Sequence, residues 1–167
     1  MTDISTEIAK ETPKSGFSGA EYNLVATGAR LEGINLFVSQ FALDPDCLLN
    51  QGQWKLSYGR KVLSCHFSDE DHSAAAVFQY NVTAKYGRKR ALHFVADYGV
   101  FYHIPNGATE EAAMGFCRNV GTFAAYPYFR ALFSQLAAEA GLRMPPLPSI
   151  ASTAHIPPKE AKKKVKA

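Results

Sequence analysis

The residue types that bind metals gather in one short stretch of the chain, which holds Cys65, His66, Asp69, Asp71 and His72. Thiolate, imidazole and carboxylate groups are the ligands that zinc takes in proteins. The stretch runs from an expected strand into a turn, and successive strand side chains point to opposite faces of a sheet. No second cluster in the sequence completes a tetrahedral site. We therefore interpret the stretch as a solvated acidic turn and expect no metal or other cofactor.

The remaining candidates for catalysis are Cys117, His93, Asp97 and His103. The chain has no glycine-rich phosphate loop, no Gly-x-Ser-x-Gly motif and no His-Glu-x-x-His motif. A buried or interface thiol suits Cys117 better than a nucleophile, because its spacing supplies no base. We expect no catalytic residues and no enzyme, and an enzyme that binds an acyl substrate in an apolar groove is the less favoured alternative.

Large apolar side chains offer binding chemistry instead. Leu48, Leu49 and Trp54 lie in a polar segment that gives them no obvious core to enter. They can face the rings of a C-terminal helix across an apolar groove. Phe129 and Phe133 have core or subunit-interface packing as the favoured alternative, because they belong to a helical apolar stripe. The candidate polypeptide-binding residues are Leu48, Leu49, Trp54, Leu56, Tyr58, Tyr126, Phe129 and Phe133.

Positive charge gathers at a turn around Arg88 and at the C-terminus. Five lysines and one glutamate give residues 159–167 a charge of +4, which leaves −1 for residues 1–158 of a chain whose total is +3. The body is therefore not a basic nucleic-acid-binding domain. Lys162, Lys163 and Lys164 could contact RNA or a ribosome, although a solubilising tail is the favoured interpretation.

The length of 167 residues and the apolar content of 47% suit one domain with tails. We expect a flexible arm over residues 1–20, a domain over residues 21–150 and a lysine-rich flexible tail over residues 151–167. No run approaches the roughly 18 apolar residues of a membrane span, and the N-terminus lacks a secretory signal. Three cysteines without Cys-x-x-Cys spacing indicate free thiols and a cytoplasmic protein.

Alternating apolar residues predict four strands, and turn residues separate them. The last three strands are joined by short turns and read as an antiparallel meander. Along the first strand, Ile34, Leu36 and Val38 are expected to share one face. The predicted strands cover residues 31–43, 61–67, 74–86 and 91–104.

A helical region follows the strands. Thr109 with two glutamates behind it predicts a helix start, and Gly141 predicts the end. Pro127 is expected in the first turn of a second helical piece, because a proline inside a helix loses a hydrogen bond. The fold class is therefore α+β, with a four-stranded antiparallel sheet followed by one main C-terminal helix.

Four features over about residues 30–150 resemble the SecB export-chaperone family. A lone tryptophan lies in the crossover LLNQGQWKLSYG, and the last strand of the meander ends in Gly99, Val100 and Phe101. Cys-x-Asn, from Cys117 to Asn119, precedes an aromatic-Pro-Tyr-x-Arg helix that runs from Tyr126 to Arg130. A glycine and then a Pro-Leu exit follow the helix.

The resemblance implies a homotetramer that holds unfolded or precursor polypeptides without ATP, for protein export and translocation. Export-coupled members carry acidic residues that dock the SecA motor, and here those places hold Val38, Ala42 and Phe94. Client holding is therefore expected more firmly than SecA docking. A SecB-like chaperone dedicated to one aggregation-prone partner, such as an antitoxin, is the alternative within the family. An RNA- or ribosome-associated protein is the alternative outside it.

Overall fold

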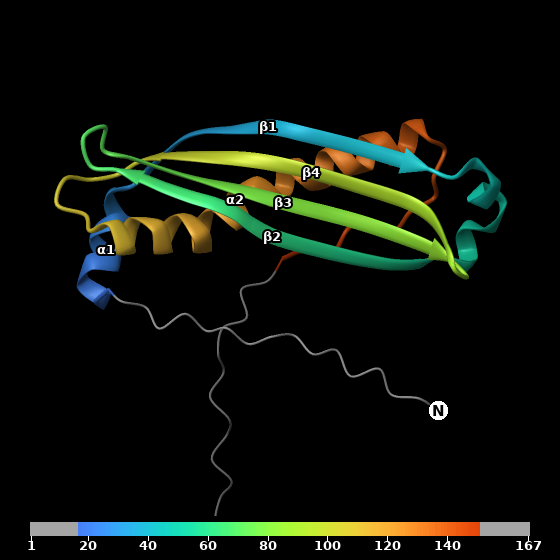
Figure 1. Ribbon diagram of the computed structural model, residues 1–167, viewed down its shortest axis with the longest axis horizontal. Helices are drawn as coiled ribbons and strands as arrows, with labels where there is room; N and C mark the ends of the chain where they lie inside the picture. The colour runs from blue at the N-terminus through green and yellow to red at the C-terminus, as the bar shows by residue number, and fades with distance from the viewer. Residues whose placement is uncertain (1–16, 151–167) are drawn as a thin grey trace, which may run out of the picture.

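The computed structural model describes residues 17–150, and the expected arm and tail lie mostly or wholly outside them. A long sheet and a long helix make up most of the structure (Figure 1). The elements in chain order are α1 (Gly19–Gly28), β1 (Arg30–Leu43), the 3-10 helix η1 (Pro45–Gln53), β2 (Lys55–Ser68), β3 (Ser73–Tyr86), β4 (Lys89–His103) and α2 (Glu110–Glu139).

The four strands form one antiparallel sheet in the order β1-β4-β3-β2. This confirms the α+β fold class and the meander of the last three strands. β2 begins six residues earlier than predicted, because Leu56 and Tyr58 pair with Ala84 and Val82 of β3. β1 and β2 are the two edges of the sheet, and neither has a second strand partner within the described residues.

A register shift in β1 changes which side chains face the helix. Leu36 pairs with Tyr98, whereas Val38 pairs with Asp97, so Phe37 is an extra residue in the strand. Such a bulge moves the following side chains to the other face. The prediction that Val38 shares a face with Ile34 and Leu36 is therefore wrong, and alternation alone could not reveal the inserted residue.

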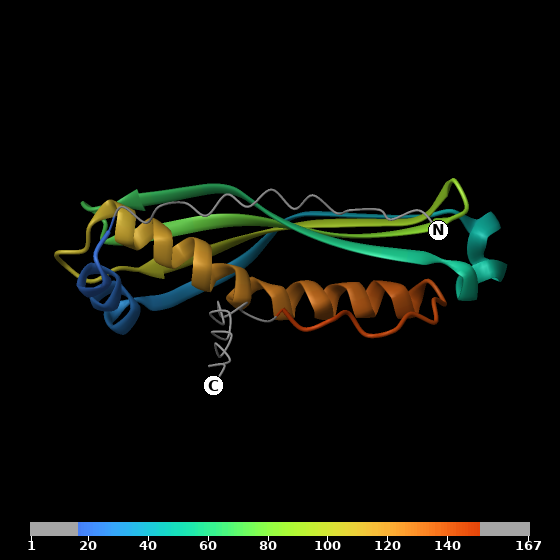
Figure 2. The same ribbon diagram turned by 90° about the horizontal axis from the view of Figure 1, so that it is seen from below.

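The helix α2 is continuous through Pro127, so the prediction of two helical pieces is wrong. Proline removes one main-chain hydrogen bond, and a helix that is held by packing on both sides of the proline can accommodate this loss by bending. Figure 2 shows α2 changing direction along its length.

Both ends of α2 are as predicted. The Thr109 hydroxyl accepts a hydrogen bond from the Ala112 N–H at 3.4 Å. At the other end Gly141 has a φ of +68°, and the N–H groups of Gly141 and Leu142 donate to the Ala138 and Ala137 carbonyls. This is a Schellman ending, which glycine favours because it has no Cβ.

The helix α1 was not predicted from the sequence. Its capping box joins Ser18 and Glu21, a Ser-x-x-Glu pattern that sequence inspection can recognise. Val25 is fully buried, and Tyr22 lies 6.3 Å from Phe116 of α2. The described part of the expected N-terminal arm therefore begins a helix that packs against α2.

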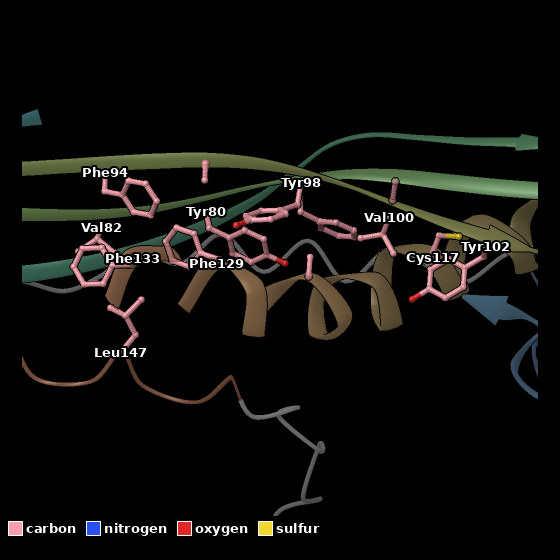
Figure 3. Packing of buried hydrophobic residues seen from close by; sticks show 14 of the residues in the cluster. Tyr80, Val82, Phe94, Tyr98, Val100, Tyr102, Cys117, Phe129, Phe133 and Leu147 are labelled. Carbon is pink, nitrogen blue, oxygen red and sulfur yellow. The ribbon is translucent and has the colours of Figure 1, made fainter. Parts of the chain in front are cut away.

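The core lies between α2 and one face of the sheet (Figure 2). Alternate residues of β3 and β4 point into it and are buried, as predicted. The Phe129 ring stacks on Tyr80 at 5.1 Å and on Phe94 at 5.2 Å, and Phe133 lies 5.6 Å from Phe94 (Figure 3). Within residues 17–150, no helix covers the opposite face of the sheet (Figures 1 and 2).

We expect Gly121→Ala to destabilise the protein. An added Cβ would lie 2.8 Å from the buried Phe78 ring, which cannot swing into solvent. Overpacking of a core costs about 1–3 kcal/mol, partly offset by about 1 kcal/mol of helix propensity. Urea unfolding should show a net loss of up to about 2 kcal/mol in the free energy of unfolding. Gly19→Ala meets nothing within 4 Å and is the control; equal stability of the two variants would contradict the packing described.

Candidate functional site

One pocket of about 220 Å³ opens beside the core, and we call it the aromatic pocket. Four segments line it: the start of β2, the middle of β3, the middle of α2 and the chain after α2. The lining residues are Tyr58, Gly59, Arg60, Tyr80, Asn81, Tyr126, Phe129, Pro148, Ser149 and Ile150.

Stacked rings form the inner wall of the aromatic pocket. Tyr80 and Phe129 are only 1% and 2% exposed, so they are fixed by the core. The Tyr126 ring lies 5.7 Å from Tyr80 and 6.1 Å from Phe129. Because the core positions these rings, the pocket is preformed.

The phenol hydroxyls of the inner wall already have partners. Tyr80 donates to the Thr122 carbonyl at 2.7 Å, and Tyr126 donates to the Pro148 carbonyl. Burial raises the pKa of Tyr80 to about 12, and burial likewise raises the pKa of Tyr126 against the opposing effect of Arg130. Both groups are therefore neutral at physiological pH. The pocket offers ring faces to a ligand rather than groups for proton transfer.

Residues 142–150 run back along α2 without regular structure (Figure 2) and form the outer wall. Leu142 and Leu147 are buried, and the Arg143 N–H donates to the Gln51 side chain at 2.8 Å. Together with the Tyr126 hydrogen bond to Pro148, these contacts fix the segment in place. The pocket therefore has an irregular wall whose own main chain is close to the surface.

Three of the sequence-predicted residues, Tyr58, Tyr126 and Phe129, line the aromatic pocket. Leu56 and Phe133 do not line it; Leu56 is half-buried against the core, and Phe133 is part of it. The binding role of all these residues stays a prediction.

The other predicted residues lie around η1, away from the pocket lining. Leu49 is 96% exposed, whereas Leu48 and Trp54 are half-buried against the core. The Trp54 indole N–H donates to the Cys47 carbonyl at 3.2 Å, so this ring fastens η1. Lys162, Lys163 and Lys164 lie outside the described residues.

Sequence reasoning missed Arg60, Asn81 and the outer wall. The second strand was predicted to begin only at residue 61, so Arg60 was not placed in a strand. In the structure Arg60 belongs to β2 and pairs with Tyr80. The exit sequence Pro-Pro-Leu-Pro was assigned only to the end of the domain. Its single leucine, Leu147, was the available signal that the exit packs on the core.

Of the chemistry-bearing residues, His72 and His103 lie together, with ring centroids 6.4 Å apart. Cys117 is fully buried, and burial raises the pKa of its thiol to about 12. His93 bonds to Thr83, and Gln79 donates to Asp97. Within residues 17–150 no three His, Cys, Asp or Glu side chains group as a metal site would need, and no helix there is long and apolar enough to cross a membrane.

Comparison with known proteins found similarity to solved structures only. No family model and no curated protein matches the chain. Among solved structures, it is similar to the Mycobacterium tuberculosis Rv1957 SecB-like chaperone in complex with a ChAD peptide from the Rv1956 HigA1 antitoxin. The TM-score is 0.66 at 16% identity, over 80% of this chain and 98% of that one. This chain therefore has a SecB-like fold, which confirms the family resemblance at the level of the fold.

We expect stability to fall in alkaline solution. Burial raises the pKa of Tyr80 and of Tyr102 from 10.0 to about 12. Below pH 10 both states keep these protons and the full stability is present. Between pH 10 and about 12 the unfolded chain ionises first, so the free energy of unfolding drops by roughly 1–3 kcal/mol per tyrosine.

Urea unfolding across this pH range checks the expectation. Tyr80→Phe should show a smaller loss than the unsubstituted protein, whereas Tyr128→Phe, at a 54% exposed position, should match it. If the free energy of unfolding of Tyr80→Phe drops at high pH by as much as that of the unsubstituted protein, the drop does not come from Tyr80, and the prediction is wrong.

Proposed function

We propose that this protein is an ATP-independent chaperone that holds non-native polypeptides through apolar side chains, and that it is not an enzyme. The aromatic pocket carries the proposal, because it is preformed, apolar and open beside a strand edge. A client side chain can enter it without opening the core. The SecB-like fold supports the same class of function.

The free edge of β2 extends the binding surface away from the pocket. Tyr58, Val62 and Leu63 are 43%, 40% and 42% exposed along this strand. An extended client can lie along such an edge and add main-chain hydrogen bonds. Each anchored apolar side chain contributes about 1.5–3 kcal/mol when fully buried, and less in a shallow site. Single contacts are weak, so several sites on one client must act together.

A homotetramer supplies those several sites. Apolar side chains crowd the free edge of β1, where Leu31, Leu36 and Phe37 are 50%, 46% and 53% exposed. A monomer that left this strip uncovered would be prone to aggregation. A second copy covering β1 removes the hazard and leaves β2 with its pocket accessible.

The client is either a range of precursors for export or one dedicated partner. The SecB-like neighbour is bound to an antitoxin peptide, which supports the dedicated partner. SecA docking is the less supported route, because Phe94, at one of the three expected acidic places, is fully buried. We place the protein in the cytoplasm, where its free thiols stay reduced.

Light scattering during refolding of an aggregation-prone protein tests the holding function. Adding this protein without ATP should suppress aggregation, with its mass determined in parallel. Tyr58→Ser removes a ring from the aromatic pocket and should weaken suppression severalfold. Tyr128→Ser removes a similarly exposed ring of α2 that does not line the pocket, and it should retain suppression.

Two results would contradict the proposal. A folded protein that leaves aggregation unchanged would exclude general holding and restrict the function to one dedicated partner. Equal loss in the two variants, with mass unchanged, would exclude the aromatic pocket as the binding site.

A further inference from the structure

The charged side chains at the aromatic pocket are positive. Arg60 lines the pocket and is exposed, and no acidic residue within residues 17–150 lines it. The Arg130 guanidinium lies over the Tyr126 ring, 6.0 Å from its centroid. The pocket therefore combines an apolar interior with a cationic rim.

The strand beside the pocket carries the same charge. β2 holds Lys55, Arg60 and Lys61 and has no aspartate or glutamate in its 14 residues. All three side chains are exposed. Arg60 pairs with Tyr80 and lies on the pocket face, whereas Lys55 and Lys61 lie on the opposite face of the strand. A client that lies along this edge therefore meets positive charge from both faces of β2.

The sequence continues from the pocket into a lysine-rich segment. Ile150 lines the pocket, and the sequence continues from it into residues 151–167. The last nine residues carry five lysines and one glutamate. Attachment at the pocket keeps these lysines within at most about 60 Å of it, since an extended chain spans about 3.5 Å per residue. Their local concentration at the pocket is therefore high.

The interior of the aromatic pocket determines which client side chain can bind beside Arg60 and Arg130. The hydroxyls of Tyr80 and Tyr126 bind the protein's own carbonyls, so the ring faces are what a client contacts. An aliphatic or aromatic side chain suits such a surface, and a carboxylate next to it in the client suits Arg60 and Arg130. Arginine adds planar hydrogen-bond donors to its charge.

We propose that the aromatic pocket selects extended polypeptide segments in which an apolar anchor is flanked by acidic residues. The C-terminal lysines strengthen the capture of such segments. This inference rests on the proposed function and names its preferred clients. It also gives the lysine tail a role at the client site in place of a role with nucleic acid.

Fluorescence anisotropy with the full chain tests the selection. Three labelled peptides of about twelve residues share one apolar core and carry glutamate, serine or lysine flanks. The glutamate peptide should bind about tenfold more tightly than the serine peptide, and the lysine peptide most weakly. The preference should shrink in about 0.5 M salt, where exposed charges are screened.

Two variants separate the pocket from the overall charge. Arg60→Glu should abolish or reverse the preference, measured as the ratio of the affinities for the glutamate and serine peptides. Arg88→Glu changes the net charge equally at the exposed β3–β4 turn, and it should keep the preference. Deletion of residues 159–167 should weaken binding of the glutamate peptide severalfold and leave the serine peptide unaffected.

The outcomes distinguish the two proposals. Equal binding of the three peptides overturns the acidic selection and leaves the holding function standing. Equal effects of Arg60→Glu and Arg88→Glu also overturn it, since net charge alone would then act. No binding of any peptide overturns the acidic selection, whereas the holding function is decided separately by the light-scattering experiment, because a short peptide engages only one site. An unchanged affinity for the glutamate peptide after deletion of residues 159–167 overturns the tail's role with clients.

Discussion

The packing of α2 against the sheet through stacked rings is the interaction on which the rest of the structure depends. Phe129 lies between Tyr80 of β3 and Phe94 of β4, and the Tyr80 hydroxyl bonds to the α2 main chain at Thr122. These contacts fix the height and direction of the helix over the sheet. They also allow α2 to continue through Pro127, because packing on both sides compensates for the lost hydrogen bond. The inner wall of the aromatic pocket is the exposed margin of this same stack.

The pocket exists because the core ends before the edge of the sheet does. Tyr126 and Phe129 cover β3, while Tyr58 of β2 remains 43% exposed, and residues 148–150 close the remaining side. A rigid wall and a segment of irregular main chain therefore meet at one opening. Under the proposed function, such a site holds an apolar side chain of a client, and charge at the rim discriminates among clients.

The sequence could predict the elements better than the site. Strong alternation in β3 and β4 and clear caps at Thr109 and Gly141 made most of the sheet and both ends of the helix visible. The bulge at Phe37 was invisible, because one inserted residue leaves a plausible apolar pattern. Apolar residues in a polar segment suggested a groove at η1; Trp54 is half-buried there and donates to the Cys47 carbonyl, and its binding role stays a prediction. Arg60 and residues 148–150 were missed because only tertiary packing brings them beside Tyr126.

The most direct measurement is an NMR titration of the full chain with a permanently unfolded polypeptide, with the shifted residues mapped on the structure. We expect perturbations to gather at Gly59, Arg60, Asn81 and Ile150, with the core signals of Phe133 and Val25 unchanged. Perturbations confined to the uncovered face of the sheet, or none at saturating polypeptide, would contradict the assignment of the aromatic pocket as the client site.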